Sequence, residues 1–319
     1  MQLGHVRPVD LMPAGSLLAL AAVLAITLVA DVSAKTWSAR EWPALQTSGA
    51  TFHVTLEPDV FDLPDAAFKA WIERSAEVLH AYYGQFPVPV ARLTLEAEGG
   101  AGVRTGRMKG WGTPRLRVVL GESSNRRHLR RDWVLVHEML HSAFPDVPDR
   151  HNWIEEGLAV YIESIARMRA GDLSREQVWG EFVRNMPKGL PGPGDLGLDR
   201  TNTWGNRYWG GAIFCLLADV YLHRESNGKT GLREALSKML AAGVDNRTSM
   251  PMARAMAMAD DMVGSEIMTK LYNERKHKAV QTDLESLWKA LGVKVDGRSV
   301  EFDDGAPDAW IRRSIEAAS

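Results

Sequence analysis

The chain has 319 residues, of which 45% are hydrophobic and 24% are charged, and its formal net charge is −2. Its length and composition are those of a folded globular protein with one large domain or two small ones. The balanced charge lacks the basic excess of most nucleic-acid-binding proteins, so no nucleic-acid partner is expected. Cys215 is the only cysteine, which excludes an intramolecular disulfide and a cysteine-based metal site. Its apolar surroundings predict a buried side chain.

The first 34 residues have the pattern of an export signal. Leu17 to Ala30 are fourteen residues that are all apolar except Thr27, and Val32 and Ala34 are small residues where a signal peptidase would cleave. Fourteen residues are few for a helix that crosses the hydrocarbon core, which needs ~20. We therefore expect a signal peptide in residues 1–34 and a periplasmic or secreted protein. The alternatives are an uncleaved anchor, in which case the chain would also contact a membrane, and a cytosolic protein.

The predicted elements change from mixed β structure to helix along the chain. A lead-in without clear period at 35–50 precedes a strand at 51–56 and a helix at 63–86. Two strands follow, at 91–98 and 115–122, with a glycine-rich hairpin or irregular edge between them. From residue 129 the pattern is almost entirely helical, apart from a short strand at 300–304. The expected helices are 129–143, 153–170, 174–185, 205–225, 230–242, 250–277 with Gly264 as a candidate break, 282–291 and 306–317.

A stretch rich in proline and glycine, Met186 to Asn206, separates two of these helices. Loops of this length in a compact domain usually form functional rims or lids, so it is a candidate border of a cleft. Its GPGDLG segment, residues 192–197, matches the glycine pattern of dinucleotide-binding loops. No predicted strand precedes this segment and no helix begins at it, so a nucleotide site is not expected.

The segment VLVHEMLH, residues 134–141, makes the most specific chemical prediction. Its apolar residues cover most sides of a helix, which predicts burial. His137 and His141 are four residues apart and share one helix face, with Glu138 beside it. Burying these groups without partners is costly. A zinc ion held by both histidines, with Glu138 as the base that activates a water, resolves the cost. The alternative is a chance pair of core histidines.

A third metal ligand is expected on the following helix. Asn152 and Glu155 have the spacing of a capping box, which leaves Glu156 without a structural role. Gly157 is a poor helix residue, and its position predicts the close approach of another backbone or of a substrate. Two histidines from one helix and Glu156 from the next would form the open three-ligand site of catalytic zinc. Glu156 could instead be a second capping or surface carboxylate.

These motifs resemble those of the gluzincin zinc metallopeptidases. The family's second motif reads Trp-x-x-Glu-Gly-x-Ala, which matches residues 153–159 and implies that Glu156 is the third zinc ligand. Residues 206–236, NRYWGGAIFCLLADVYLHRESNGKTGLREAL, are similar to the region after the zinc site in the glycyl aminopeptidase-like subgroup, as is the end of the chain. The resemblance covers about residues 105–319, and its zinc motifs are the specific part.

The resemblance implies an α+β, thermolysin-like fold, with a small mixed sheet, an active-site helix and a mainly helical C-terminal part. We accordingly predict a catalytic subdomain at 51–170, which contains both zinc-binding helices, and a helical subdomain at 171–319. The implied activity is hydrolysis of peptide bonds in a peptide or protein substrate with one bound zinc ion. Whether it acts at chain ends or within chains stays open.

Two further residues are candidates for roles around the metal. The resemblance implies that Tyr208 donates a hydrogen bond to the oxyanion formed during amide hydrolysis. Metal-bound histidines usually donate their second N–H to a carboxylate or carbonyl. Glu163, seven residues after Glu156 and on the same helix face, is the candidate partner. Tyr208 could instead be a half-buried core tyrosine, and Glu163 an ordinary surface residue.

The chain departs from the family pattern at two places. The aminopeptidase relatives hold a lysine where this chain has Gly210. They also bind the substrate's free amine with a Gly-x-Met-Glu-Asn stretch on the edge strand. The region that we align with this stretch, residues 110–120, has no glutamate, and Glu122 at its far end is no obvious substitute. Metal-dependent hydrolysis therefore carries over better than specificity for amino termini.

Alternative functions follow from these departures. One is a zincin-fold protein that has lost catalysis and serves binding or assembly; the other is a zinc hydrolase with a non-peptide substrate. His151 is expected to be a surface loop histidine, although it could bind substrate or act as an acid. Four methionines in the segment 250–262 are expected to pack in the core rather than to bind copper: Met252, Met256, Met258 and Met262.

Overall fold

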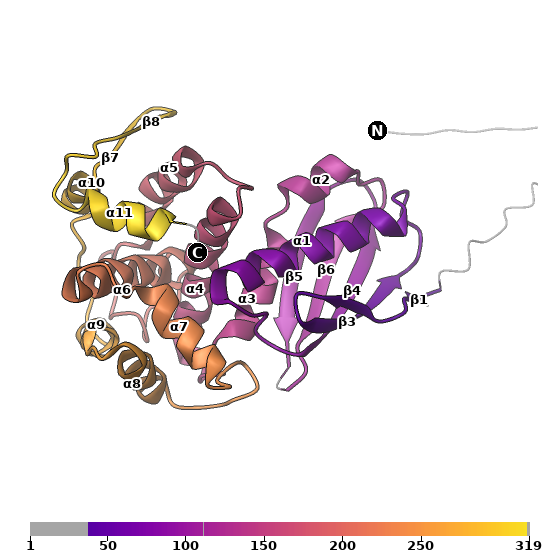
Figure 1. The fold of residues 1–319 in the computed structure, drawn as a ribbon, viewed down its shortest axis with the longest axis horizontal. Coiled ribbons are helices and arrows are strands. Elements are labelled where there is room, and N and C mark those ends of the chain that lie inside the picture. Colours follow the sequence, from indigo (N-terminus) through magenta and orange to yellow (C-terminus); the bar gives the residue numbers. More distant parts are fainter. Residues whose placement is uncertain (1–37, 111, 318–319) are drawn as a thin grey trace, which may run out of the picture. The chain divides into compact units, whose positions relative to one another are not determined.

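The computed structural model describes residues 38–110 and 112–317, which belong to one compact unit. The predicted export signal at 1–34 lies outside the described residues. A β-sheet with its helices occupies one end of this unit and a group of helices the other (Figure 1). The predicted α+β class is confirmed, whereas the division into two subdomains near residue 170 stays a prediction. Among the described helices, none has both the length and the apolar character needed to cross a bilayer.

One mixed sheet organises the N-terminal end. Its strands β3, β4 and β6 are parallel, and β5 closes one edge antiparallel to β6. Two short strands, β1 and β2, pair antiparallel with β3 at the other edge. The bounds are β1 (Arg40–Glu41), β2 (Leu45–Thr47), β3 (Ala50–Glu57), β4 (Val90–Glu98), β5 (Val103–Lys109) and β6 (Arg115–Gly121).

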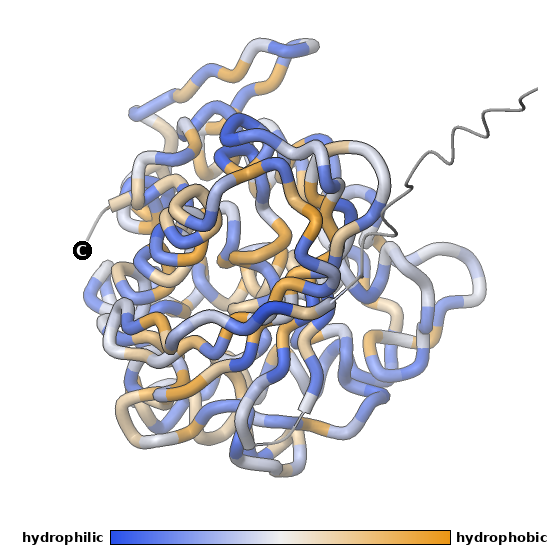
Figure 2. Tube along the Cα trace, turned by 90° about the vertical axis from the view of Figure 1, so that its right-hand side faces the viewer, coloured by the Kyte–Doolittle hydropathy of each residue, from blue (hydrophilic) through white to orange (hydrophobic). Residues whose placement is uncertain are grey.

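The two faces of the sheet differ in polarity. Alternate residues such as Phe52, Leu93 and Val118 are buried, and α1 (Asp65–Tyr83) lies across this apolar face (Figure 1). The residues in the opposite phase are exposed, as Arg92 and Arg115 are, or partly exposed. Strand alternation therefore places the core between the sheet and its helices. Hydrophobic and hydrophilic residues accordingly alternate along the extended parts of the chain (Figure 2).

Several short strands were not predicted. Residues 103–109, expected to be part of a glycine-rich hairpin, form the edge strand β5. They carry little hydrophobic alternation because the phase that faces a helix includes Gly106, which has no side chain, beside Met108. The lead-in at 35–50 contains β1 and β2, and the predicted strand at 300–304 is the second half of a hairpin. That hairpin consists of β7 (Val293–Asp296) and β8 (Ser299–Phe302).

The helix predicted at 129–143 is wrong as a single element. It is divided into α2 (Arg126–Arg131) and α3 (Val134–Leu140), because Asp132 has extended backbone angles. The Asp132 carboxylate accepts hydrogen bonds from the backbone N–H groups of Val134 and Leu135 at 2.9 and 3.0 Å. It also accepts one from the Trp71 indole at 3.2 Å. Asp132 therefore caps α3 and ties it to α1.

The C-terminal end consists of helices packed around α4 and α6. The predicted helix at 205–225 begins as a π-helical turn at Asn206–Gly210 and continues as α6. The predicted break at Gly264 is confirmed, since α8 ends there. The bounds are α4 (Asn152–Arg169), α5 (Arg175–Asn185), α6 (Gly211–Ser226), α7 (Leu232–Ala241), α8 (Met252–Val263), α9 (Ile267–Arg275), α10 (Leu284–Leu291) and α11 (Ala309–Glu316).

The backbones of α4 and α6 touch at two glycines. A Cβ atom on Gly157 would lie 2.4 Å from the Cα of Gly211, and one on Gly211 would lie 2.0 Å from the carbonyl oxygen of Trp153. No other residue fits at either position without moving a helix. The close backbone approach predicted at Gly157 is therefore confirmed.

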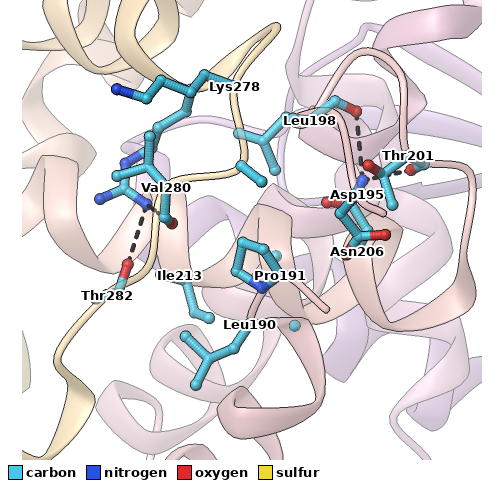
Figure 3. Close-up of a pocket in the computed structure, with 15 residues that line it drawn as sticks. Leu190, Pro191, Asp195, Leu198, Thr201, Asn206, Ile213, Lys278, Val280 and Thr282 are labelled. Atoms are coloured by element: carbon cyan, nitrogen blue, oxygen red, sulfur yellow. Dashed lines mark hydrogen bonds between the residues drawn. The ribbon is translucent and has the colours of Figure 1, made fainter. Parts of the chain in front are cut away.

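The proline- and glycine-rich loop, residues 186–206, packs against the body of the protein. The Asn206 side-chain amide donates hydrogen bonds to the carbonyls of Leu198 and Thr201. Leu198 in turn donates its backbone N–H to the carbonyl of Arg275. Figure 3 shows Leu190, Leu198 and Asn206 around a small pocket that the segment carrying Lys278 and Val280 closes. The loop is thus held by side-chain hydrogen bonds within it and by a backbone hydrogen bond to the end of α9.

We predict that Asp132→Ala lowers the free energy of unfolding by about 1–2 kcal/mol, because the first N–H groups of α3 lose their cap. Urea denaturation followed by circular dichroism measures this change. Asp261→Ala is the matched control, since Asp261 is an exposed helix residue with no hydrogen bond or ion pair among the described residues. Equal stability of the two variants would contradict the capping role.

We predict that Gly157→Ala destabilises the protein by about 1–3 kcal/mol, because the added methyl group overlaps the Gly211 backbone. Thermal unfolding measures the loss. Gly99→Ala provides the control, because a Cβ atom there has no neighbour within 4 Å. A Gly157→Ala protein as stable as the control would show that α4 and α6 separate at little cost.

Candidate metal centre and active site

Helix α3 and the 3-10 turn that follows it at His141–Ala143 carry the three residues of the predicted metal motif. His137, Glu138 and His141 have potential ligand atoms that all lie within 4.8 Å of one another. His137 and Glu138 are buried, and the His137 and His141 rings meet edge to face with centroids 5.0 Å apart. The one-turn spacing therefore brings both imidazoles to one point, as the sequence predicts.

Helix α4 brings Glu156 to the same point. Its Oε2 lies 3.2 Å from Nε2 of His137 and 3.8 Å from Nε2 of His141. The capping box predicted at Asn152 and Glu155 is wrong. Asn152 is already helical, its Oδ1 has no partner, and a 3-10 turn at 149–151 precedes it. Glu156 is nevertheless in the predicted place, because the turn only shifts the helix start.

These three residues fit a zinc ion. Atoms bound to zinc at ~2.0–2.2 Å in a tetrahedron lie about 3.4 Å apart, close to the two observed separations from Glu156. Burial and the neighbouring His137 lower the pKa of His141 to about 4, so its imidazole is neutral and keeps a lone pair for a metal. Burial acts to raise the pKa of Glu156, but the hydrogen bond with His137 and the charges of both histidines lower it below its usual value.

Glu138 lies between α3 and the edge strand β5. Its side chain contacts Gly106, where a Cβ atom would lie 2.4 Å from Glu138 Cγ, and it accepts a backbone hydrogen bond from Met108. Burial raises the pKa of the Glu138 carboxyl to about 7. The sequence analysis missed Gly106 and Met108, because neither residue type marks a site without knowledge of the strand pairing.

Tyr208 projects from the π-helical turn that precedes α6. Its hydroxyl hydrogen-bonds the Glu156 carboxylate, and its ring stacks near His137 with centroids 6.4 Å apart. Burial and the negative charge of Glu156 raise the pKa of Tyr208 to about 12, so the hydroxyl stays protonated and able to donate. The structure thus brings the predicted Tyr208 to the same cluster as the metal motif.

A cavity of about 500 Å³ opens beside this cluster. His137 and Tyr208 lie at the cluster side, and the indoles of Trp133, Trp204 and Trp209 contribute to its wall. Trp133 and Trp204 are about half exposed, which is unusual for so large an apolar side chain. Lys188 also lines the cavity, so the loop at 186–206 borders it. The hypothesis that this loop borders the cleft is consistent with this position.

Glu163 does not contact a histidine, which corrects the prediction for this residue. It is buried, and its carboxylate accepts hydrogen bonds from Arg167 and from Ser164 at 3.1 Å. The Nδ1 atoms of His137 and His141 are buried without a partner among the described residues. A buried arginine on the same helix competes for the carboxylate, which the spacing of Glu163 alone does not reveal.

His151 is buried and so is not the surface residue that the sequence predicts. Its Nδ1 lies 2.8 Å from Asp199, which also accepts hydrogen bonds from Trp153 at 2.8 Å and from Tyr272 at 3.1 Å. Asp199 belongs to the loop at 186–206, so this buried network joins the loop to the start of α4. Its role is to position the helix that carries Glu156.

The region aligned with the family's amine-binding stretch also needs correction. Residues 115–120 belong to β6, which lies inside the sheet, whereas β5 is the edge strand beside Glu138. The residues at the end of the edge strand beside Glu138 are Gly106 to Gly110, and their fourth residue, where the family stretch has glutamate, is Lys109. Gly210 is tightly enclosed, since a Cβ atom there would lie 3.2 Å from both Asn206 and the Gly189 carbonyl.

The remaining candidates have structural positions. Cys215 is fully buried, as predicted. Met252 and Met256 are buried in the hydrophobic core, and Met258 and Met262 pack against it. These positions agree with the expectation of core packing.

Comparisons with known proteins support the fold. No protein-family model matches the sequence, and no curated protein matches it. A crystal structure of an aminopeptidase N family protein from Idiomarina loihiensis is similar with a TM-score of 0.59 at 14% identity. The similarity covers 81% of this chain and 50% of that one. An M1 zinc metallopeptidase from Deinococcus radiodurans has a TM-score of 0.48 at 16% identity, over 77% and 53% of the two chains. The chain thus spans about half the length of these proteins, and its fold is similar to that of the aminopeptidase N family protein.

Proposed function

We propose that this protein is an exported zinc-dependent peptidase. The observation that carries the proposal is the convergence of His137, His141 and Glu156, with Glu138 beside them and a cavity next to them. Two imidazoles and one carboxylate leave a position open for water or substrate, which is typical of catalytic rather than structural zinc. The similar fold of an aminopeptidase N family protein agrees with this proposal.

The residues divide the reaction between them. A zinc ion held by His137, His141 and Glu156 would supply Lewis acidity, which polarises a carbonyl and acidifies water. Glu138 accepts the proton of the attacking water and returns it to the leaving amine. The Met108 N–H holds the Glu138 carboxylate in position for both transfers. Tyr208 turns its hydroxyl from Glu156 to the oxyanion as negative charge develops there.

The substrate proposed for this site is an extended polypeptide segment. Strand β5 is the edge of the sheet and lies directly beside Glu138, so its free backbone groups can pair with an added strand. The cavity beside His137 and Tyr208 then takes a large side chain, for which the exposed indoles of Trp133 and Trp204 provide contact area.

Variants of Glu156 and Glu138 separate metal binding from turnover. Glu156→Ala is expected to lose zinc, because one of three ligands is removed. Glu138→Gln is expected to keep about one zinc per chain and to lose peptide hydrolysis by roughly 10²–10⁴-fold, because the base is removed. Elemental analysis of the purified protein and hydrolysis of a mixed peptide library measure the two properties.

Glu73→Gln is the control for both variants, since Glu73 is exposed on α1 and has no partner among the described residues. Unchanged hydrolysis by Glu138→Gln would refute the mechanism. Absence of zinc in the unmodified protein, even after reconstitution, would refute the metal site itself. Zinc binding without cleavage of any peptide would favour a non-peptide substrate or a binding role.

Tyr208 can be tested by removing its hydroxyl group. Tyr208→Phe is expected to lower kcat by roughly 10²–10³-fold with unchanged zinc content, because one oxyanion donor is lost while the metal ligands remain. Steady-state kinetics beside elemental analysis measure this separation. Tyr221→Phe serves as the control, since Tyr221 is only partly buried on α6 and lies outside the cluster. If the kcat of Tyr208→Phe equals that of the control, the oxyanion role is refuted and Tyr208 serves only in packing.

A further inference from the structure

A row of basic side chains crosses the face of the sheet that lies away from α1. The strand register places His53 of β3 opposite Arg92 of β4, Arg92 opposite Arg115 of β6, and Arg115 opposite Lys109 of β5. All four residues are exposed and share the outward phase of their strands. At ~4.8 Å between strands, this basic row is about 14 Å long.

The basic row is unfavourable for the sheet by itself. Like charges directly opposite each other on neighbouring strands destabilise their pairing. Lysine on an edge strand commonly serves to prevent aggregation, which would account for Lys109 alone. Arg92 and Arg115 lie on interior strands, where this explanation does not apply. A role outside the sheet is therefore needed for the row.

The row lacks internal charge compensation. Arg92, Arg115 and Lys109 have no side-chain hydrogen bond or ion pair among the described residues, whereas Arg117 in the next row pairs with Glu96. The acidic residues of this face are in other rows of the strand register: Glu41, Glu57, Glu96 and Glu98. Charge on this face therefore changes from positive to negative along the strands.

A hollow of about 250 Å³ lies within the basic row. His53, Arg92 and Arg115 line it together with the polar Thr94, and Glu41 lies at its β1 side. Two guanidinium groups and an imidazole around one hollow suit a phosphate oxyanion, which arginine binds through two parallel N–H groups.

The chain that precedes the described residues indicates the occupant, in the alternative in which residues 1–34 are not cleaved. The apolar stretch Leu17 to Ala30 ends ten residues before Arg40 of β1, a distance that extended chain spans within about 36 Å. A single short apolar segment gives only weak membrane binding, and stable binding needs a second signal such as a basic patch. β1 pairs with β3, the strand that carries His53, so the tether joins the sheet beside the basic row.

We propose that this face docks on an anionic lipid surface, with the basic row against the headgroups and one headgroup phosphate in the hollow. The apolar stretch supplies the first membrane signal and the row the second. Gly106 and Met108, which contact Glu138, have the opposite phase of β5 from Lys109. Docking through the row therefore leaves the metal centre on the side of the sheet that faces away from the lipid.

The test measures binding of the full chain to vesicles. One set contains phosphatidylcholine alone and the other phosphatidylcholine mixed with phosphatidylglycerol. The face variant combines Arg92→Gln, Arg115→Gln and Lys109→Gln. The control variant combines Arg126→Gln, Arg127→Gln and Arg130→Gln, which remove the same charge from exposed residues of α2.

The unmodified chain is expected to prefer anionic vesicles and to lose this preference at high salt. The face variant is expected to bind them weaker on the order of 100-fold, while the control variant binds like the unmodified chain. Equal binding to both vesicle types, or equal losses in the two variants, would overturn the proposal. Tighter binding to polyglutamate than to anionic vesicles would also overturn it and assign the face to an acidic polypeptide.

Thermal unfolding shows whether the variants are folded. The face variant is expected to unfold at the same temperature as the unmodified chain or higher, because repulsion between opposed cations is removed. If it unfolds at a lower temperature, vesicle binding of the unmodified chain at increasing salt provides the test. Binding to anionic vesicles that does not weaken with salt would then overturn the proposal.

Discussion

The backbone contact between Gly157 and Gly211 holds α4 and α6 closer together than any side chain would allow. Glu156 precedes the first glycine by one residue, and Tyr208 precedes the second by three. The contact therefore sets the separation at which the carboxylate and the phenol meet. Because α4 also packs on α3, the same contact determines where Glu156 stands relative to His137. A buried polar cluster tolerates little error in such distances, since each group lacks water as an alternative partner.

The surroundings of the cluster support this geometry from two sides. Asp132 begins α3 at a defined residue and so sets the rotation at which Glu138 faces Gly106. The Asp199 network holds the start of α4 through His151 and Trp153. These residues act through hydrogen bonds to the helices that carry the site. The position of a side chain on a helix depends on where the ends of that helix are held. Sheet and helices thus contribute different parts of one site.

The local sequence predicted the elements in which residue types recur at a regular spacing. The four-residue spacing of His137 and His141 and the strong periodicity of the long helices were sufficient for the metal motif and for the helical C-terminal end. Glu156 was predicted from its motif, although the capping argument at Asn152 was wrong. The single helix at 129–143 failed because Asp132 competes for the backbone N–H groups, an effect that hydrophobic periodicity does not report.

The sequence alone therefore indicated the α+β class from the order of its periodic segments, and the pair His137 and His141 from their spacing within one helix. Glu156 followed from the resemblance of residues 153–159 to a family motif. Only the tertiary structure decided which partner each group meets. In the tertiary structure β5 is the edge strand beside Glu138, and Glu163 forms an ion pair with Arg167. His151 is buried against Asp199. Arg92 lies opposite Arg115 in the strand register. These outcomes depend on strand order, register and competition between distant residues, and such contacts leave no periodic trace along the chain.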